Sequence, residues 1–316
     1  MIRGVGKFSY ELVIVASDED IEHVLSHLTW YHRNLNPNKI VIICPGVTVS
    51  KYQTEVQTSS LEIINEEKVL PGLTLNRVRE IIVSRGEDGH RAGWYLQQFL
   101  KMGYAFSSST TEYLIWDADT IPLNYLNYHT SDNKCIFTMK DEFHKPYFDT
   151  LEKLLEYGKQ TQQSFIAEHM LVNKDRMIEL ISEIESNSSL YGSSFFEKIL
   201  YSINKNNLSK SGFSEFETYG SFILHNYPST YSMRRLKTAR HAKIVLGVSP
   251  SESALNWFSK CYDTLSLEKW DSEIGVLKSL SQNNLFQNIV PAVIAYNVAQ
   301  AVACMRFVLE KIRFII

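Results

Sequence analysis

The sequence has few of the features that mark secreted, membrane-spanning or zinc-binding proteins. Its 316 residues include four cysteines, which are Cys44, Cys135, Cys261 and Cys304. None of them forms a Cys-x-x-Cys pair, which argues against a zinc site and favours buried thiols in a reducing cytoplasm. The first residues, 1–7, lack the apolar core of a signal peptide. No uninterrupted apolar stretch reaches the roughly 18 residues that a membrane-spanning helix needs.

Strong charge of either sign is absent as well. The formal net charge is -3, the pI is about 6.3, and no long charge run occurs. We therefore do not expect nucleic acid as a partner. What the chain does contain is 44% hydrophobic and 12% aromatic residues. A chain of this length and composition can bury a substantial core, as one large domain or as one domain with an appendage.

The stretch 112–123, Glu-Tyr-Leu-Ile-Trp-Asp-Ala-Asp-Thr-Ile-Pro-Leu, is the most informative one. Residues 113–116 form an apolar, β-prone run that predicts a buried strand, and Pro122 stops further pairing. The strand ends on Asp117 and Asp119, whose side chains share a face because they are two residues apart. Two such charges repel each other unless a cation lies between them. Paired carboxylates suit Mg²⁺ or Mn²⁺, which would hold the phosphates of a nucleotide diphosphate.

Two other interpretations of this pair stay open. Many Asp-x-Asp pairs are solvated loop charges. Phosphatases of the haloacid-dehalogenase type also place two aspartates two residues apart at a strand end, and Asp117 would then be the nucleophile. Those enzymes usually carry Thr or Val where this chain has Ile121. They also open their domain with the motif and follow it with a Gly-Asp-rich acidic loop, which this sequence lacks.

The N-terminal part of the sequence predicts the beginning of a parallel sheet. Residues 8–16 and 39–44 are apolar, strand-like runs, and residues 20–34 between them have helical spacing. Strand, helix and strand with short joints are typical of parallel sheets, whose ligands bind at the carboxyl ends of the strands. Ser17 and Asp18 follow the first strand, so we expect them at the same edge as the aspartate pair.

The region before the central strand is irregular and partly strand-like over residues 47–75, and it then predicts a helix from about Arg91 to Gly103. Trp94, Gln97, Gln98 and Lys101 recur at spacings of three and four residues and form one polar face of that helix. Arg91 at a helix N-terminus favours a phosphate, and Trp94 can pack against a base or a sugar, with Gln98 beside it. An ordinary core tryptophan with a surface arginine is the open alternative.

Three strings in this order carry a resemblance to a known family. They are Arg-Ala-Gly-Trp-Tyr-Leu-Gln-Gln-Phe-Leu-Lys (91–101), Tyr-Leu-Ile-Trp-Asp-Ala-Asp-Thr (113–120) and Ser-Glu-Phe-Glu-Thr-Tyr-Gly (214–220). Together they resemble bacterial glycosyltransferases encoded in capsule and O-antigen clusters, many of which are known only as conserved domains of unknown function. The resemblance covers about residues 8–250. It implies a glycosyltransferase-A fold, with a Rossmann-like nucleotide-binding half, a metal-binding Asp-x-Asp and a second half that takes the acceptor.

The resemblance also implies the organisation of the chain. We expect an α/β catalytic domain over residues 1–250, with a mixed, mostly parallel sheet. Its nucleotide-sugar half spans 8–123 and its acceptor half spans 124–250. A helical C-terminal extension follows over 251–316.

The predicted acceptor half contains two pairs of ionisable residues. Glu168 and His169 interrupt an apolar run, and buried charges need partners or a task. They are candidates for acceptor binding, and a satisfied core histidine is the alternative. In inverting members of the resembled fold an acidic residue in this region takes the proton of the acceptor hydroxyl. Glu217 is therefore the first candidate base and Glu215 the second, unless both only stabilise the N-terminus of the following helix electrostatically.

The resemblance further implies a histidine from the C-terminal part of the domain that completes the metal shell. His225 and His241 are the available histidines, and His241 is the expected third ligand beside Asp117 and Asp119. It lies in a basic run, 234–243, that could face the diphosphate leaving group. A solvated basic helix face explains that run as well.

The expected function is metal-dependent transfer of a hexose from a nucleotide-diphosphate sugar, UDP-sugars first, to a hydroxyl of a capsule or O-antigen acceptor. The cofactor would be Mn²⁺ or Mg²⁺. A non-catalytic carbohydrate-binding protein is the third hypothesis, and the intact aspartate pair counts against it. Residues 289–316 predict an amphipathic helix with interleaved Lys and Arg, which favours peripheral contact with the inner face of the membrane and with lipid-linked acceptors. Packing on the enzyme itself or on a second subunit explains the pattern equally well.

Overall fold

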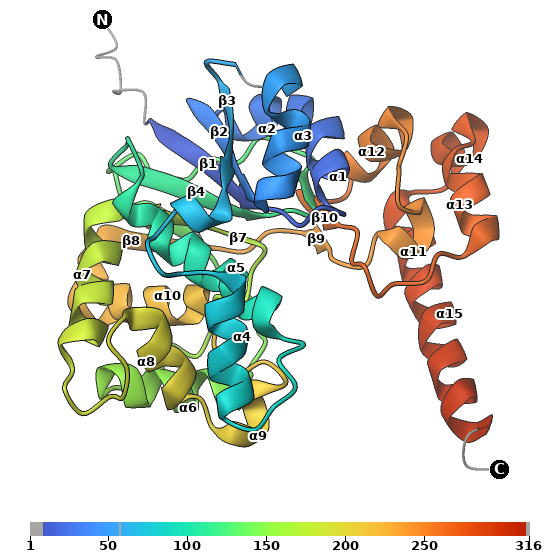
Figure 1. Cartoon of the computed structure of the whole chain (residues 1–316). Coiled ribbons are helices and arrows are strands. Elements are labelled where there is room, and N and C mark those ends of the chain that lie inside the picture. The colour runs from blue at the N-terminus through green and yellow to red at the C-terminus, as the bar shows by residue number, and fades with distance from the viewer. Residues whose placement is uncertain (1–8, 57, 314–316) are drawn as a thin grey trace, which may run out of the picture. The chain divides into compact units, whose positions relative to one another are not determined.

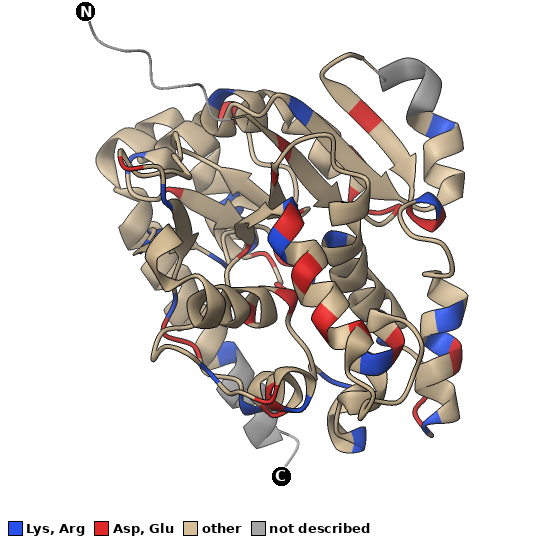
Figure 2. Cartoon of the chain, turned by 90° about the vertical axis from the view of Figure 1, so that its left-hand side faces the viewer, with Lys and Arg blue, Asp and Glu red and all other residues tan. Residues whose placement is uncertain are grey.

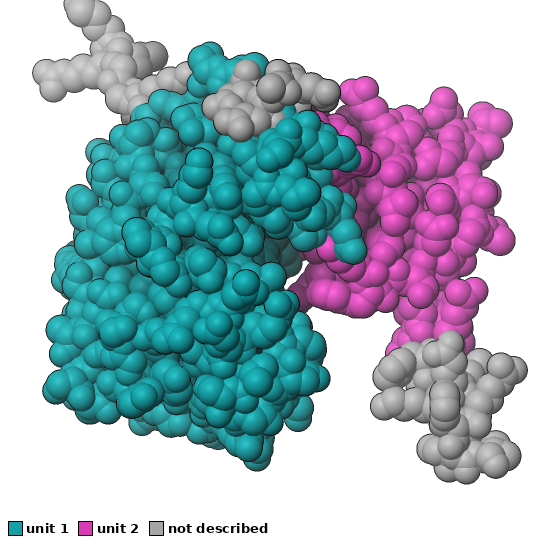
Figure 3. Space-filling view, in the orientation of Figure 1, with its two compact units in different colours: residues 1–21, 37–118, 127–235 teal, residues 22–36, 119–126, 236–316 magenta. Residues whose placement is uncertain are grey.

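A computed structural model describes residues 9–56 and 58–313 of the chain (Figure 1). Phe8, the start of the first predicted strand, and residues 314–316, the end of the last predicted helix, lie outside the described residues. The chain divides into two compact units (Figure 3). Unit 1 comprises residues 1–21, 37–118 and 127–235, and unit 2 comprises residues 22–36, 119–126 and 236–316. The domain boundary predicted after residue 250 therefore falls inside unit 2.

Unit 1 is built on a five-stranded sheet of order β3-β2-β1-β4-β7. The strands are β1 (Tyr10–Val15), β2 (Lys39–Cys44), β3 (Leu61–Asn65), β4 (Glu112–Asp117) and β7 (His169–Asn173). The first four are parallel, and β7 pairs antiparallel with β4. The predicted α/β class with a mixed, mostly parallel sheet is thus confirmed. Such sheets are buried on both faces, and every residue of β1 is buried.

The helices between these strands were predicted unevenly. Helix α5 (Ala92–Gly103) begins and ends where the sequence predicts. Helix α4 (Leu75–Ser84) is capped at its N-terminus by Thr74, whose side chain accepts a hydrogen bond from the Arg77 backbone N–H. Residues 47–75 are less irregular than expected, because α3 (Gly46–Val56) and β3 lie there. Helix α3 contains Val, Thr and Ser at many positions, residues with weak helix propensity, so its sequence does not predict a helix.

The remainder of unit 1 is mainly helical, with a short two-stranded sheet. Its elements are α6 (Lys145–Leu155), α7 (Lys174–Ser186), α8 (Phe195–Ser202), α9 (Lys205–Leu208), α10 (Glu215–Asn226), β6 (Cys135–Thr138) and β8 (Tyr231–Arg234). Helix α10 packs against α5, α6 and α7. Gly220 allows this packing, because a Cβ there would lie 2.3 Å from a ring carbon of Phe165. Acidic and basic residues are interspersed along the ribbon (Figure 2).

Unit 2 has a three-stranded sheet of order β5-β10-β9 and a cluster of helices. Its elements are α2 (Leu28–Leu35), β5 (Thr120–Pro122), β9 (Thr238–Ala239), α11 (Lys243–Leu246), α12 (Glu252–Ser259), β10 (Thr264–Ser266), α13 (Gly275–Ser281), α14 (Asn284–Ile289) and α15 (Ala292–Arg313). Helix α1 (Ile21–Ser26) joins the two units in sequence.

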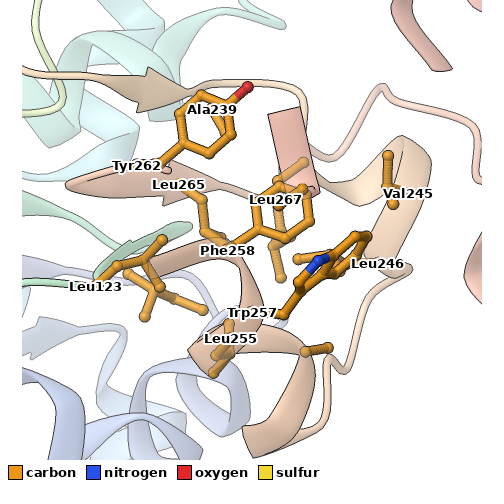
Figure 4. Packing of buried hydrophobic residues seen from close by; sticks show 14 of the residues in the cluster. Leu123, Ala239, Val245, Leu246, Leu255, Trp257, Phe258, Tyr262, Leu265 and Leu267 are labelled. Carbon is orange, nitrogen blue, oxygen red and sulfur yellow. The ribbon is translucent and has the colours of Figure 1, made fainter. Parts of the chain in front are cut away.

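A buried apolar cluster holds unit 2 together. Trp257 and Phe258 of α12 pack with Leu265 of β10 and Leu123, as Figure 4 shows. Burying a large apolar side chain of this kind stabilises a fold by about 1.5–3 kcal/mol. The cluster draws on three separate segments of sequence, which explains why unit 2 is discontinuous. Among the residues that the structure describes, no helix combines the length and hydropathy needed to cross a membrane.

Candidate functional site

The site begins where β4 ends. The side chains from Tyr113 to Trp116 are fully buried, and Asp117, the last residue of the strand, is half-buried. Unit 1 ends after Ala118 in this part of the chain, and Asp119 opens a segment of unit 2. The two carboxylates of the Asp-x-Asp motif therefore take their partners from different units, and we describe each with its own partners.

Asp117 is paired with a buried lysine. The Nζ atom of Lys101, on α5, donates to Asp117 Oδ1 at 2.6 Å and to Glu215 Oε1 at 2.9 Å. Burial alone would lower the pKa of Lys101, but the two carboxylates raise it above its usual value. One ammonium group thus faces two carboxylates, and the cluster retains one negative charge. A buried, uncompensated charge favours a further cation or a strong hydrogen-bond donor.

Gln98 belongs to the same cluster. Its Oε1 accepts from the Glu215 backbone N–H at 3.3 Å, so α5 contacts the N-terminus of α10 through both Gln98 and Lys101. Sequence reasoning placed Lys101 on the polar face of this helix but gave it no role. The available signal was a single lysine, one turn after Gln98, in the apolar second half of a helix.

Asp119 is paired with a residue that sequence reasoning missed. Its carboxyl group is hydrogen-bonded to that of Glu268, and Arg240 Nε donates to Glu268 Oε1 at 3.0 Å. Burial and the charge of Asp119 raise the pKa of Glu268 to about 8. The Arg240 guanidinium offsets part of this shift, and two carboxyl groups this close share a proton when no metal ion lies between them. Glu268 follows β10, a strand of three residues that is too short to be predicted from its sequence.

The segment that follows β10 lies between His241 and Asp119 and pairs with both. An isolated β-bridge joins His241 to Leu267, and the Leu267 N–H donates to the Asp119 carbonyl at 2.9 Å. His241 Nδ1 lies 3.1 Å from Asp271 Oδ1. A carboxylate on one ring nitrogen orients the imidazole and leaves the other nitrogen for a ligand, as in many metal sites. His225, the other candidate, belongs to unit 1 and stacks on Tyr157 with 4.0 Å between ring centroids.

The donor types of these residues, two carboxylates and an imidazole in the same unit, are those that a divalent cation of the manganese type accepts. Asp119 and Glu268 offer carboxylate oxygens, and His241 offers an imidazole nitrogen already oriented by Asp271. Carboxylates suit Mg²⁺ and Mn²⁺, whereas an imidazole ligand favours the transition metal. A cation between the two carboxyl groups would replace the proton that they share.

Glu217, the first candidate base, is buried. Its Oε1 accepts from Ser164 Oγ at 2.5 Å and from the Phe165 N–H at 3.0 Å, and Oε2 has no hydrogen-bond partner. Burial raises its pKa above 4.5, which is partly offset by these two donors. Glu217 is 1% exposed, so an acceptor reaches its carboxyl group only after a local rearrangement. Glu215 is held by Lys101, as described above.

Glu168 and His169 are also buried. Lys140 Nζ lies 3.2 Å from the Glu168 carboxylate. His169 Nδ1 lies 2.9 Å from the Tyr128 hydroxyl, and its ring stacks on Trp116 at 4.7 Å. Burial keeps the pKa of His169 well below its usual value, so the ring is neutral. These contacts are those of a core histidine with partners.

The expected donor-binding residues lie in two places in unit 1. Ser17 follows β1, and its hydroxyl donates to Asp20 at 2.6 Å. Asp18 is exposed. The pKa of Cys44, at the end of β2, is raised mainly by the burial of Cys44 and in addition by the charge of Asp18. Both residues thus follow the carboxyl end of β1, as predicted for this edge of the sheet.

Arg91 and Trp94 lie together at the N-terminus of α5. The Arg91 guanidinium stacks on the Trp94 ring at 4.4 Å, and its Nε donates to the Lys210 carbonyl at 2.8 Å. Arg91 precedes Lys101 by almost three helical turns, which separates their backbones by about 15 Å. The end of α5 that meets Asp117 is therefore its C-terminal end.

Comparison with protein families gives one match. The family model described as "Family of unknown function (DUF6492)" matches residues 17–276. The chain belongs to this family. A comparison with curated proteins finds no match.

Several solved structures have partial structural similarity to this DUF6492 member. A galactosyltransferase, LgtC, in complex with donor and acceptor sugar analogs has 10% identity and a TM-score of 0.38, over 81% of this chain and 86% of that one. Mouse xyloside xylosyltransferase 1 has 9% identity and a TM-score of 0.36, over 84% of this chain and 100% of that one. GlyE of Streptococcus pneumoniae TIGR4 has 11% identity and a TM-score of 0.38, over 94% of this chain and 64% of that one. At these values the likeness does not assign a function to the chain.

Proposed function

We propose that this protein is a metal-dependent glycosyltransferase of the glycosyltransferase-A type. It would move a hexose from a nucleotide-diphosphate sugar, UDP-sugars first, to a hydroxyl of a capsule or O-antigen acceptor. The observation that carries the proposal is the carboxyl pair of Asp119 and Glu268, with His241 held by Asp271 nearby in the same unit. Such a set has the composition of a site for Mn²⁺, and the Asp-x-Asp motif follows a central parallel strand, where ligands of such sheets bind.

The metal site would consist of Asp119, Glu268 and His241, all in unit 2, whereas Asp117, the first residue of the motif, belongs to unit 1. A divalent cation bound there would supply charge neutralisation to the diphosphate leaving group. Asp117 would be held in place by Lys101, which donates to it at 2.6 Å. A side chain fixed in this way loses little conformational entropy when a ligand binds.

The nucleotide sugar would lie along the edge where β1 and β4 end, with Ser17 and Asp18 as polar contacts. We keep Arg91, Trp94 and Gln98 as donor-binding candidates. Gln98 is the one that contacts the cluster of Lys101, through the Glu215 backbone.

Glu217 would be the general base for the acceptor hydroxyl, and Glu168 and His169 are candidates for acceptor binding. A general base needs a pKa near the working pH, and burial raises that of Glu217 in this direction. Its free Oε2 atom is the group that would take the acceptor proton. Because Glu217 is buried, this role requires that the segment at Ser164 opens when the acceptor binds.

The test is the thermal stability of the purified protein against UDP, GDP, CDP and TDP, each with and without Mn²⁺. A ligand that binds the native state raises the melting temperature by mass action. We expect one diphosphate to stabilise the protein in the presence of Mn²⁺ and to have little effect without it. The same nucleotide then identifies the donor for an assay of sugar transfer.

A phosphatase with Asp117 as nucleophile is the competing function. It predicts no stabilisation by any diphosphate and Mg²⁺-dependent hydrolysis of simple phosphate esters. The ion pair of Asp117 with Lys101 does not decide between the two functions, because Lys101 donates to Oδ1, one of the two carboxylate oxygens. Hydrolysis without nucleotide binding would overturn the glycosyltransferase proposal.

A further inference from the structure

A second group of potential metal ligands lies at the other end of β4. Glu112 is the first residue of β4, and Cys135 is the first residue of β6. His129 lies between them in sequence and forms an isolated antiparallel bridge with Cys135. All three belong to unit 1. Sequence reasoning missed the group, because it looked for cysteine pairs and this set contains one cysteine, one histidine and one glutamate.

The side chains of the three residues converge. His129 Nε2 lies 2.8 Å from Glu112 Oε2, and Cys135 Sγ lies 3.1 Å from Glu112 Oε1. One ligand atom from each residue lies within 4.8 Å of the other two. Tetrahedral zinc with its usual bond lengths places such atoms about 3.4–3.6 Å apart. The observed arrangement therefore needs only small side-chain adjustments to accept the ion.

Burial and charge agree with a bound Zn²⁺. His129 is 3% exposed and Cys135 6%, while the Glu112 side chain is 16% exposed, which leaves one side of the group open to water. A thiolate and a carboxylate neutralise a divalent ion, so the loaded site carries no net charge, as a buried site requires. A soft thiolate with an imidazole selects zinc over magnesium or manganese.

One nearby group opposes a cation. Arg176 interacts electrostatically with both Glu112 and Cys135. Its guanidinium is engaged elsewhere: NH1 donates to Thr230 Oγ1 at 3.0 Å, and the group stacks over the Tyr227 ring at 4.3 Å. Without metal, Glu112 is the acceptor for both of its neighbours, so zinc must replace two hydrogen bonds with coordinate bonds.

We propose that Glu112, His129 and Cys135 form a zinc-binding site, with water as the fourth ligand. The site is separate from the candidate centre at Asp119 and does not depend on the proposed transferase activity. It would fasten the start of β4 to the turn that leads into β6. That turn has its own constraint, because Asn133 adopts a left-handed backbone with φ of 64°.

The test uses the full chain, stripped with a chelator, dialysed and reloaded with zinc or cobalt. We expect one zinc per chain by elemental analysis and a sulfur-to-cobalt charge-transfer band in the cobalt-loaded protein. Cys135→Ser and His129→Gln should lose both, and zinc should raise the melting temperature of the wild type but not of these variants. Cys44→Ala is the matched control, because it removes a buried thiol of the same unit and leaves the three ligands intact.

Two results would overturn the proposal. The first is a wild-type protein that takes up no zinc or shows no thiolate band with cobalt, a measurement that does not depend on any variant folding. The second is equal zinc uptake by the wild type, Cys135→Ser and His129→Gln, with melting temperatures in chelator showing that the variants are folded. Uptake lost in Cys44→Ala to the same extent would equally refute the assignment to Cys135.

Discussion

The Lys101 ammonium group lies 2.6 Å from the Asp117 carboxylate, and both side chains come from elements at the centre of unit 1. The same ammonium contacts Glu215 on α10. The first aspartate of the Asp-x-Asp motif is therefore already held by a protein cation. This relationship makes Lys101 a positioning residue for the proposed site, and it couples α5 and β4 to α10, which is distant from both in sequence.

Lys101→Met should destabilise the protein, because it leaves the buried carboxylate of Glu215 and the half-buried one of Asp117 without their cation. Breaking a buried ion pair by removing one partner costs about 3–5 kcal/mol. Lys134→Met is the control, since the Lys134 side chain is 42% exposed and its pairing with Asp132 contributes little, about 0–1 kcal/mol. Urea unfolding of the two variants and the wild type measures the difference. Equal midpoints for Lys101→Met and the wild type would show that the pair does not stabilise the fold.

The pair of Asp119 and Glu268 should behave in the opposite way. Asp119→Asn and Glu268→Gln each remove one of two carboxyl groups that must share a proton, so in chelator we expect Asp119→Asn to melt at or above the wild-type temperature. Glu268→Gln should melt lower than Asp119→Asn, because it also loses the charged partner of Arg240. Both should lose the stabilisation by nucleotide diphosphate with Mn²⁺, and Asp119→Ala should abolish metal-dependent sugar transfer while the fold stays intact. Glu273→Gln is the control, because Glu273 belongs to the same unit and pairs with Lys278 at the surface. A Glu268→Gln variant with an unchanged manganese response would remove Glu268 from the proposed site.

Sequence reasoning succeeded where the signal is local. The continuous apolar run before Asp117 predicts β4, and the polar face of Trp94 and Gln98, with Gly103 at its end, predicts α5. It failed where the contact is long-range. Lys101 meets Glu215 across 114 residues, and Glu268 reaches Asp119 from a strand of three residues that no periodicity marks. The discontinuous unit 2 was not foreseen for the same reason, since its segments 22–36 and 119–126 carry no sign that they leave the first unit.

Glu217→Gln separates a catalytic role from a structural one. The glutamine can still accept from Ser164 and from the Phe165 N–H, so the fold should persist while transfer to the acceptor falls, by about 10²–10⁴-fold for the loss of a general base. Donor binding, measured as the thermal shift with nucleotide and Mn²⁺, should be unchanged. Ser164→Ala is the comparison, because it removes a hydrogen bond to Glu217 but keeps the carboxylate.

The pH dependence of stability gives an independent check on Glu217. Its pKa is raised above 4.5 in the folded protein, so ionisation opposes folding, and this cost is absent below the unfolded value and present at neutral pH. Glu217→Gln removes the cost. The variant should therefore gain stability relative to the wild type as pH rises from about 4 to 7, and a constant difference over that range would contradict a buried, high-pKa carboxyl group.

The exposed apolar side chains of α15 test the predicted membrane contact. Ile294, Val298 and Met305 are exposed by 52%, 49% and 58%, although they are large and apolar. An amphipathic helix binds a bilayer surface through such a face. We expect the protein to sediment with vesicles of anionic lipid, and we expect Val298→Asp to reduce this, whereas Asn256→Asp on α12 should not.

The results distinguish the three explanations of this helix, which are membrane contact, packing on a second copy of the chain, and packing on the enzyme itself. If the wild type sediments with vesicles and Val298→Asp does not, lipid-linked saccharides become the first acceptors to assay. If neither sediments but Val298→Asp lowers the molecular mass measured by light scattering, the face belongs to a second copy of the chain. If Val298→Asp changes neither sedimentation nor mass, the apolar face has no partner among those tested, and the membrane prediction is wrong.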